Sequence, residues 1–233
     1  MRFVAAGASV RGPAHIDQNS PNQDAITLRG NQGGWIAAAC DGLGSCAKSH
    51  LGSRAAASVV SDMLSAGLES PASHVNASIH EQWLRRISPH SVSDVATTCL
   101  WASVNRDGNC LLGQLGDGLI LFRSRGRFFR LTPDRQGYGN QTLALWREHK
   151  EQHWHQAECF LIQPGDGLVL MTDGVSDDLV PDALEGFFDA LYLNITQRGR
   201  RSGRRWLEKE LETWSTPMHG DDKSVVAIFR ADQ

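Results

Sequence analysis

Aspartates at the ends of apolar segments are the side chains of this chain best suited to chemistry. Three of them are followed by glycine and come after an uncharged apolar run: Asp41 after residues 35–40, Asp117 after 111–116 and Asp173 after 168–172. Such a run is typical of a buried strand, and Asp-Gly directly after it is typical of a turn. A further predicted strand, 224–229, is instead preceded by Asp221 and Asp222. We therefore expect several carboxylates at strand ends.

Antiparallel pairing would bring some of these carboxylates together. Residues 23–28 and 35–40 are predicted strands, and the turn sequence 31–34 between them predicts a hairpin. Asp24 at the start of the first strand then lies beside Asp41 at the end of the second. Carboxylates this close repel one another and cannot all stay ionised without cations. Oxygen ligands without nearby His or Cys favour Mg²⁺ or Mn²⁺ over zinc.

Other interpretations of these motifs are weaker. The chain has five Asp-Gly pairs, and those at Asp107 and Asp166 precede strands, which is typical of ordinary turns. Residues 42–47 match the Gly-x-Gly-x-x-Ala pattern of dinucleotide-binding loops. That reading, which would indicate a nucleotide-dependent oxidoreductase, requires an acid at the end of a second strand, whereas Asp62 falls within a predicted helix.

The order of predicted elements indicates an α+β fold. Strands are expected at 2–10, 23–28, 35–40, 96–104, 110–115, 119–123, 128–131, 159–162, 168–172 and 224–229. Helices are expected at 49–66, 75–87, 179–195 and 204–214. Short strands joined by hairpins, with helices inserted early and late, favour antiparallel sheets covered by helices. Residues 12–22 and the polar segment 132–156 are expected to be loops, and loops as long as the second often cover a site.

Composition narrows the classes of function. The 233 residues carry a formal net charge of −3, which gives no general attraction to nucleic acid or to an anionic membrane. Five cysteines without a Cys-x-x-Cys pair suit buried thiols in a reducing compartment. No apolar run has the length of a secretory signal or a membrane span. We expect a cytoplasmic protein with one domain, residues 1–233, and neither nucleic-acid nor membrane partners.

Two groups of basic and histidine side chains have simpler explanations than a binding site. His149 and His153 have helical spacing, but no glutamate follows His149 as a zinc-protease motif requires, so we interpret them as surface or flap residues. Arg198, Arg200, Arg201, Arg204 and Arg205 could attract an anionic partner. A solvated loop that leads into a helix is the commoner explanation of such a run.

Taken together, the motifs resemble those of a known enzyme family. In chain order they are Asn22-Gln23-Asp24, Asp41-Gly42-x-Gly44, Thr97-Thr98, Gly116-Asp117, Thr172-Asp173-Gly174 and Asp221-Asp222-x-Ser224. This order is similar to that of the metal-dependent type 2C serine/threonine protein phosphatases, from about residue 7 to residue 229. Ser9-x-x-Gly12-x-x-His15 and Ser49-x-x-Gly52 resemble the compact bacterial branch of the family.

The resemblance implies a four-layer α-β-β-α sandwich, in which two antiparallel sheets are flanked by helix pairs, with a binuclear metal centre at one edge. Asp41 would bridge two Mg²⁺ or Mn²⁺ ions, and the Gly42 carbonyl would bind one of them. Asp173 and Asp221 would hold the other ion. Asp24 would support the first, and Asp117 matches the acid associated with a third, weaker ion. The ions would activate a water for in-line attack on the phosphate.

This sequence departs from the family at its substrate-binding arginine. That residue usually lies three positions before the Asn of the first motif, and Asn19 stands there. A guanidinium is a strong phosphate ligand, so another group must replace it. We expect His15, Arg11 or Lys48 to contact the substrate.

The sequence thus predicts a bacterial signalling enzyme that dephosphorylates phosphoserine or phosphothreonine in proteins and opposes a partner kinase. The catalytic residues would be Asp41, Asp173 and Asp221, which act through the metal-activated water. The main alternative is a regulatory or binding module that keeps the fold without turnover. The complete set of acids favours the enzyme.

Overall fold

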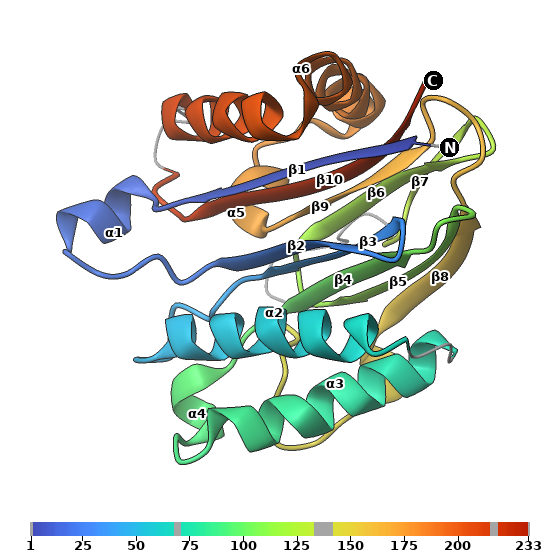
Figure 1. The fold of residues 1–233 in the computed structure, drawn as a ribbon. Helices are drawn as coiled ribbons and strands as arrows, with labels where there is room; N and C mark the ends of the chain where they lie inside the picture. Colours follow the sequence, from blue (N-terminus) through green and yellow to red (C-terminus); the bar gives the residue numbers. More distant parts are fainter. Residues whose placement is uncertain (1, 68–70, 133–141, 215–218, 233) are drawn as a thin grey trace.

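Two antiparallel sheets lie face to face in the computed structural model, and helices cover their outer faces (Figure 1). The structure describes residues 2–67, 71–132, 142–214 and 219–232. Four layers result, in the order helix, sheet, sheet and helix. The predicted α+β sandwich is confirmed.

The first sheet has five strands in the order β1-β10-β9-β6-β7. Their bounds are Arg2–Val10 for β1, Leu119–Ser124 for β6, Arg127–Arg130 for β7, Gly167–Met171 for β9 and Lys223–Ala231 for β10. The terminal strands β1 and β10 pair along their whole length, with Val10 opposite Lys223. Residues far apart in sequence therefore meet at one sheet edge, where the segments after β1 and before β10 lie together.

The second sheet has the order β2-β3-β4-β5-β8. Its strands are β2 (Ala25–Asn31), β3 (Gly34–Cys40), β4 (Cys99–Val104), β5 (Asn109–Leu115) and β8 (His155–Phe160). The predicted β2–β3 hairpin is present, and Ala25 pairs with Cys40. Gln32 and Gly33 between the strands both have positive φ, as a two-residue hairpin turn requires. Asp24 and Asp41 are consequently adjacent at the open end of the hairpin.

Helices α2 (Ser49–Ser65) and α3 (Ala72–Ile87) cover the second sheet, as predicted. The first sheet is covered by α6 (Leu184–Thr213), where the sequence predicted two separate helices. Gly199, with φ 70° and ψ 178°, interrupts the helical backbone within this span, so α6 consists of two helical parts, as predicted, with a shorter break between them than expected. The second helix pair of the sandwich is thus formed by the two parts of α6, which run in different directions in Figure 1.

Short elements account for the remaining differences from prediction. The predicted loop 12–22 contains α1 (Pro13–Asp17), and α4 (Val92–Val95) and α5 (Asp173–Ser176) were not predicted. Two single turns, η1 (Glu151–His153) and η2 (Pro181–Ala183), complete the structure. The predicted strand 159–162 is instead β8, which begins at His155, inside the segment 132–156. Residues 133–141 of that segment lie outside the described residues.

Three apolar clusters hold the layers together. One lies between the two sheets, and the others lie between each sheet and its helices. Trp83 of α3 is fully buried, and its indole Nε1 donates a 3.1 Å hydrogen bond to the Gly52 carbonyl of α2. No helix in the described part of the chain is long and apolar enough to cross a bilayer. All five cysteines are buried free thiols.

Gly52 tests this packing. A Cβ at Gly52 would lie 1.6 Å from the Val95 backbone oxygen, so Gly52→Ala forces α2 away from α4. We expect it to lower the free energy of unfolding by about 3 kcal/mol in urea titrations.

Gly186→Ala is the matched control, because a Cβ there meets nothing within 4 Å and the site is an exposed helix position. That change should raise stability by about 0.5–1 kcal/mol. Equal effects of the two changes would contradict the packing described.

Candidate metal centre

An acid-lined cleft lies at the edge of the sandwich where Asp24 and Asp41 are adjacent. Its volume is about 410 Å³. The residues that line it are Ala14, His15, Gln23, Asp41, Gly42, Leu43, Gly44, Asp117, Thr142, Asp173, His219, Gly220 and Asp221. Carboxylate oxygens of Asp41, Asp117 and Asp173 lie within 4.8 Å of one another. Acids that are far apart in the sequence therefore face one space.

Backbone hydrogen bonds fix the position of Asp41. Its N–H donates to Thr98 Oγ1 at 2.8 Å, and its carbonyl accepts from Thr97 Oγ1 and from the Thr98 N–H, both at 2.8 Å. The two threonines thus hold Asp41 by its main chain and leave its carboxylate for the cleft. A Cβ at Gly42 would lie 2.7 Å from Ser49, so only glycine lets the chain pass this close to the start of α2.

Asp24 is buried behind Asp41 and does not line the cleft. Its Oδ2 accepts a 2.8 Å hydrogen bond from Thr172 Oγ1, which in turn accepts one from the Ser224 N–H at 3.1 Å. Thr172 precedes Asp173 directly. One hydroxyl therefore connects the β2–β3 hairpin of one sheet to β9 and β10 of the other, and it fixes Asp24 relative to Asp173.

Asp117 reaches the cleft from a tight turn, and Asp173 reaches it from the start of a short helix. Gly116 before Asp117 has a φ of 111°, which only glycine adopts without strain. Thr142 Oγ1 donates a 2.6 Å hydrogen bond to Asp117 Oδ2, so part of the predicted covering segment 132–156 does reach the site. Asp173 begins α5, and a Cβ on the following Gly174 would lie 1.8 Å from the Asp222 carbonyl oxygen.

Asp222 has a structural role that the sequence did not reveal. It is buried, and its two oxygens accept hydrogen bonds from the N–H groups of Gly12 at 2.7 Å and Gln23 at 2.6 Å. These contacts fasten the segments after β1 and before β2 to the start of β10. The neighbouring Asp221 lines the cleft, while its Oδ1 accepts from the Asp222 N–H at 2.8 Å.

Burial and mutual repulsion raise the pKa values of the clustered acids. Burial is the largest cause in each case, and neighbouring carboxylates add to it. The pKa of Asp24 rises to about 7 and that of Asp173 to about 6. The pKa of Asp41 lies well above its usual range, because its carboxyl is buried and because Asp24, Asp173, Asp221 and Asp117 repel its charge. Such a set is stable as carboxylates only when positive charge is supplied.

His15 is the predicted substrate-contacting residue that lines the cleft. Its Nδ1 lies 2.9 Å from Asp222 Oδ2, at ion-pair distance but outside hydrogen-bond geometry. Arg11 and Lys48 are exposed and do not line the cleft, and Arg11 Nη1 donates to the Ser20 carbonyl at 3.1 Å. Of the three candidates, the structure brings only His15 to the acids.

His219 is a cleft residue that the sequence analysis missed. Its Nδ1 lies 2.7 Å from Asp178 Oδ1, and the other oxygen of Asp178 accepts a 3.0 Å hydrogen bond from Trp214 Nε1. The carboxylate therefore orients the imidazole toward the cleft. Nothing in the local sequence signals this role, because Asp178 and His219 are 41 positions apart.

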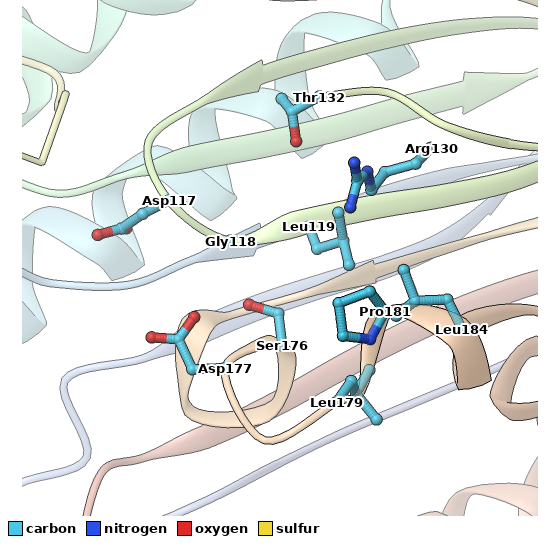
Figure 2. A pocket seen from close by; sticks show the side chains of 10 residues that line it. All are labelled: Asp117, Gly118, Leu119, Arg130, Thr132, Ser176, Asp177, Leu179, Pro181 and Leu184. Carbon is cyan, nitrogen blue, oxygen red and sulfur yellow. The ribbon is translucent and has the colours of Figure 1, made fainter. Parts of the chain in front are cut away.

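A smaller cavity of about 150 Å³ adjoins the cleft through Asp117, which lines both. Figure 2 shows the carboxylates of Asp117 and Asp177 at one end of it and the side chains of Leu119, Pro181 and Leu184 toward the other. The lining of this cavity is thus acidic near the metal centre and apolar at its other end.

Comparison with known families identifies this arrangement. The sequence model of protein phosphatase 2C matches residues 11–214, most of the chain. The chain belongs to the protein phosphatase 2C family. Membership implies serine/threonine phosphatase activity toward phosphoproteins. Among curated proteins, none matches this sequence.

Solved phosphatase structures share the fold. The catalytic domain of the serine/threonine protein phosphatase PstP, in complex with two manganese ions, is 19% identical over 99% of both chains, with a TM-score of 0.68. RsbX in complex with magnesium is 15% identical over 97% of this chain and 94% of that chain, with a TM-score of 0.63. The photosystem II phosphatase PBCP is 15% identical over 98% of both chains, with a TM-score of 0.68.

The residues of this cleft fit divalent cations. The donor set consists of carboxylates, without cysteine, and such oxygen ligands suit Mg²⁺ and Mn²⁺. The raised pKa values of Asp24, Asp41 and Asp173 show that the same side chains lack compensating positive charge of their own. His15, Asp221 and Asp222 form a second group whose ligand atoms lie within 4.8 Å of one another.

The pH dependence of unfolding of the metal-free protein tests the raised pKa of Asp24. A carboxyl whose pKa is about 7 when folded and 3.8 when unfolded contributes stability below pH 4 that is lost as the pH rises toward 7. Asp24→Asn cannot ionise. In the presence of a chelator, we therefore expect the free energy of unfolding of Asp24→Asn to increase relative to that of the wild type as the pH is raised from 4.5 to 7. Urea unfolding at these two pH values measures the change.

With saturating Mn²⁺ at pH 7, the wild type should instead be more stable than Asp24→Asn, because cations stabilise the ionised cluster of the wild type. Asp107→Asn, in an exposed turn, is the control and should follow the wild type at both pH values. A stability difference between Asp24→Asn and wild type that does not change with pH would contradict the raised pKa.

Proposed function

We propose that this chain is a Mg²⁺- or Mn²⁺-dependent serine/threonine protein phosphatase with one catalytic domain, and that it opposes a partner kinase. The observation that carries the proposal is the convergence of Asp41, Asp117 and Asp173 on one cleft that Asp221 also lines. Family membership supports the reaction class. A regulatory module without turnover would not need to keep this costly set of acids.

Each acid has a proposed role that agrees with its placement. Asp41 would hold two cations, and the Gly42 carbonyl would bind one of them. Asp173 and Asp221, which also line the cleft, would hold the other cation. Asp24, which is buried, would support the first cation from behind. Asp117 would hold a third, weaker cation.

The chain's own residues supply the geometry of hydrolysis. When bound, divalent cations supply Lewis-acid chemistry: they lower the pKa of a water and neutralise phosphate charge. Hydrogen bonds from Thr97 and to Thr98 fix the main chain of Asp41, and a hydrogen bond from Thr172 fixes the carboxylate of Asp24. These two acids therefore need little rearrangement to bind cations. With Nδ1 beside Asp222, His15 has Nε2 left for a phosphate oxygen. No side-chain nucleophile is required.

Hydrolysis of p-nitrophenyl phosphate tests the proposal. We expect turnover by the wild type that depends on Mn²⁺ or Mg²⁺ and is abolished by chelator. Asp173→Asn removes one carboxylate charge from the cluster and should lower kcat/KM by more than about 100-fold. Asp107→Asn makes the same change in an exposed turn and should leave the rate unchanged. Equal rates for wild type and Asp173→Asn, or turnover in chelator, would exclude this mechanism.

A phosphopeptide substrate tests which residue replaces the missing arginine. His15→Ala should raise KM about tenfold, because a charge-assisted hydrogen bond to the phosphate is lost. Arg11→Ala and Lys48→Ala should leave KM within twofold, since neither side chain lines the cleft. If His15→Ala left KM unchanged while one of the other two changes raised it, His15 would not be the phosphate ligand.

A further inference from the structure

A groove separate from the metal centre lies between the kinked helix α6 and the outer edges of the two sheets. Its volume is about 560 Å³. The residues that line it are Ala6, Gly7, Ala8, Ser9, Ile26, Leu28, Arg200, Arg201, Arg204 and Glu208. Its floor consists of small or apolar residues of β1 and β2, and its charged wall consists of one side of α6. The run of arginines thus lies in the two helical parts of α6 on either side of Gly199; the side chains are exposed, as predicted, but the predicted loop is limited to the break at Gly199.

The backbone of α6 explains why the arginines converge on this groove. The left-handed conformation of Gly199 bends the helix immediately before Arg200. After the bend, Gly203 packs against β1, with its Cβ position 3.6 Å from the Ala6 Cβ. An added methyl group would be at ordinary van der Waals distance from β1, so the helix lies close to the strand here. The exposed side chains of Arg201 and Arg204, which flank Gly203, are thereby held beside the groove.

The groove arginines have no ion-pair partner among the residues that the structure describes. Arg123 shows the usual arrangement on the first half of α6, where it pairs with Glu185 at 2.9 Å and Asp189 at 2.7 Å. In the described part of the chain, no ion pair joins Arg200, Arg201 or Arg204 to a carboxylate. Arg200 instead stacks on Trp35, 5.1 Å from the ring centroid. The groove therefore has three arginines and one glutamate, in a chain whose net charge is −3.

The groove leads toward the metal centre. At one end, Ser9 Oγ accepts a 2.9 Å hydrogen bond from Asn22 Nδ2, and the amide oxygen of Asn22 accepts from the Asp24 N–H. At the other end, Arg200 contacts Trp35, whose partner across the hairpin is Gly30. Gly30 is six residues from Asp24 along β2, which corresponds to about 20 Å of extended chain.

We propose that this groove binds an acidic, extended segment of the phosphoprotein substrate, about six or more residues from the phosphorylated side chain. Arginine guanidinium groups pair with carboxylates in bidentate geometry, which gives a docking site charge selectivity. The binding of an acidic segment does not depend on catalysis, whereas its effect on turnover rests on the proposed phosphatase activity.

A protein segment fits the groove better than a nucleic acid. Three arginines on one helix turn, above a floor of alanine, glycine and aliphatic side chains, match a few carboxylates on a narrow chain. The net negative charge of the protein would repel a longer polyanion. No aromatic ring is among the described lining residues, and Trp35 at one end of the groove is stacked by Arg200, which reduces the ring surface available to bases.

Direct binding is the first test, and it needs neither metal nor turnover. A fluorescent, Glu-rich decapeptide without phosphate should bind the wild type in anisotropy titrations, more weakly as salt rises. Arg201→Glu/Arg204→Glu, which spares the Arg200–Trp35 contact, should weaken binding at least tenfold. Arg106→Glu/Arg205→Glu makes the same change in net charge at exposed sites outside the groove and should alter affinity less than twofold.

Turnover is the second test. A phosphoserine peptide with glutamates about six residues from the phosphate should have a higher kcat/KM than the same peptide with glutamines. Arg201→Glu/Arg204→Glu should abolish that advantage while leaving p-nitrophenyl phosphate hydrolysis unchanged. If circular dichroism shows that this variant does not fold, Arg201→Gln/Arg204→Gln replaces it. Equal peptide binding by wild type and groove variant, or tighter binding of a ten-nucleotide single-stranded DNA than of the peptide, would overturn the proposal.

Discussion

The repulsion between carboxylates gathered at one edge of the sandwich is the constraint on which the site depends. Asp24 and Asp41 come from one sheet, and Asp173 and Asp221 come from segments next to β9 and β10 of the other. Their proximity and burial raise the pKa values of Asp24, Asp41 and Asp173. Folding the chain therefore assembles an arrangement that is unfavourable by itself and that divalent cations would stabilise.

The surrounding structure resists this repulsion with hydrogen bonds to the main chain and to the carboxylates. Thr97 and Thr98 hold Asp41 by its backbone, and Thr172 links Asp24 to β10. Asp222 fastens two segments at its buried position. These contacts join the two sheets at the edge where the acids converge. Separating the two sheets at this edge would require these hydrogen bonds to break together. They therefore keep the cluster in place.

Much of this arrangement was predictable from the sequence, because local patterns determine it. The turn at Gln32-Gly33 fixed the β2–β3 hairpin and hence the adjacency of Asp24 and Asp41. Apolar periodicity located α2 and α3. The Asp-Gly pair at Asp166 was correctly separated from the site: its buried carboxylate instead accepts backbone hydrogen bonds from the β6–β7 turn and from Ile162 and Gln163.

The remainder depends on contacts between distant residues, which periodicity does not encode. Asp222 resembles its neighbour Asp221 in sequence, yet one is a buried structural acceptor and the other faces the cleft. His219 reaches the cleft only through its partner Asp178. The helical state of residues 196–198 and 200–203 was missed because glycines and arginines carry no apolar stripe there, although Gly203 packs closely on β1. Tertiary packing decided each of these cases.

A crystal structure of the protein soaked in Mn²⁺, with anomalous diffraction measured at the manganese edge, tests the central claim most directly. The account predicts two strong anomalous peaks in the cleft, both within about 2.3 Å of Asp41 carboxylate oxygens. Asp173 and Asp221 should coordinate one of the two. The absence of anomalous density at Asp41, with manganese bound only elsewhere on the protein, would contradict the account.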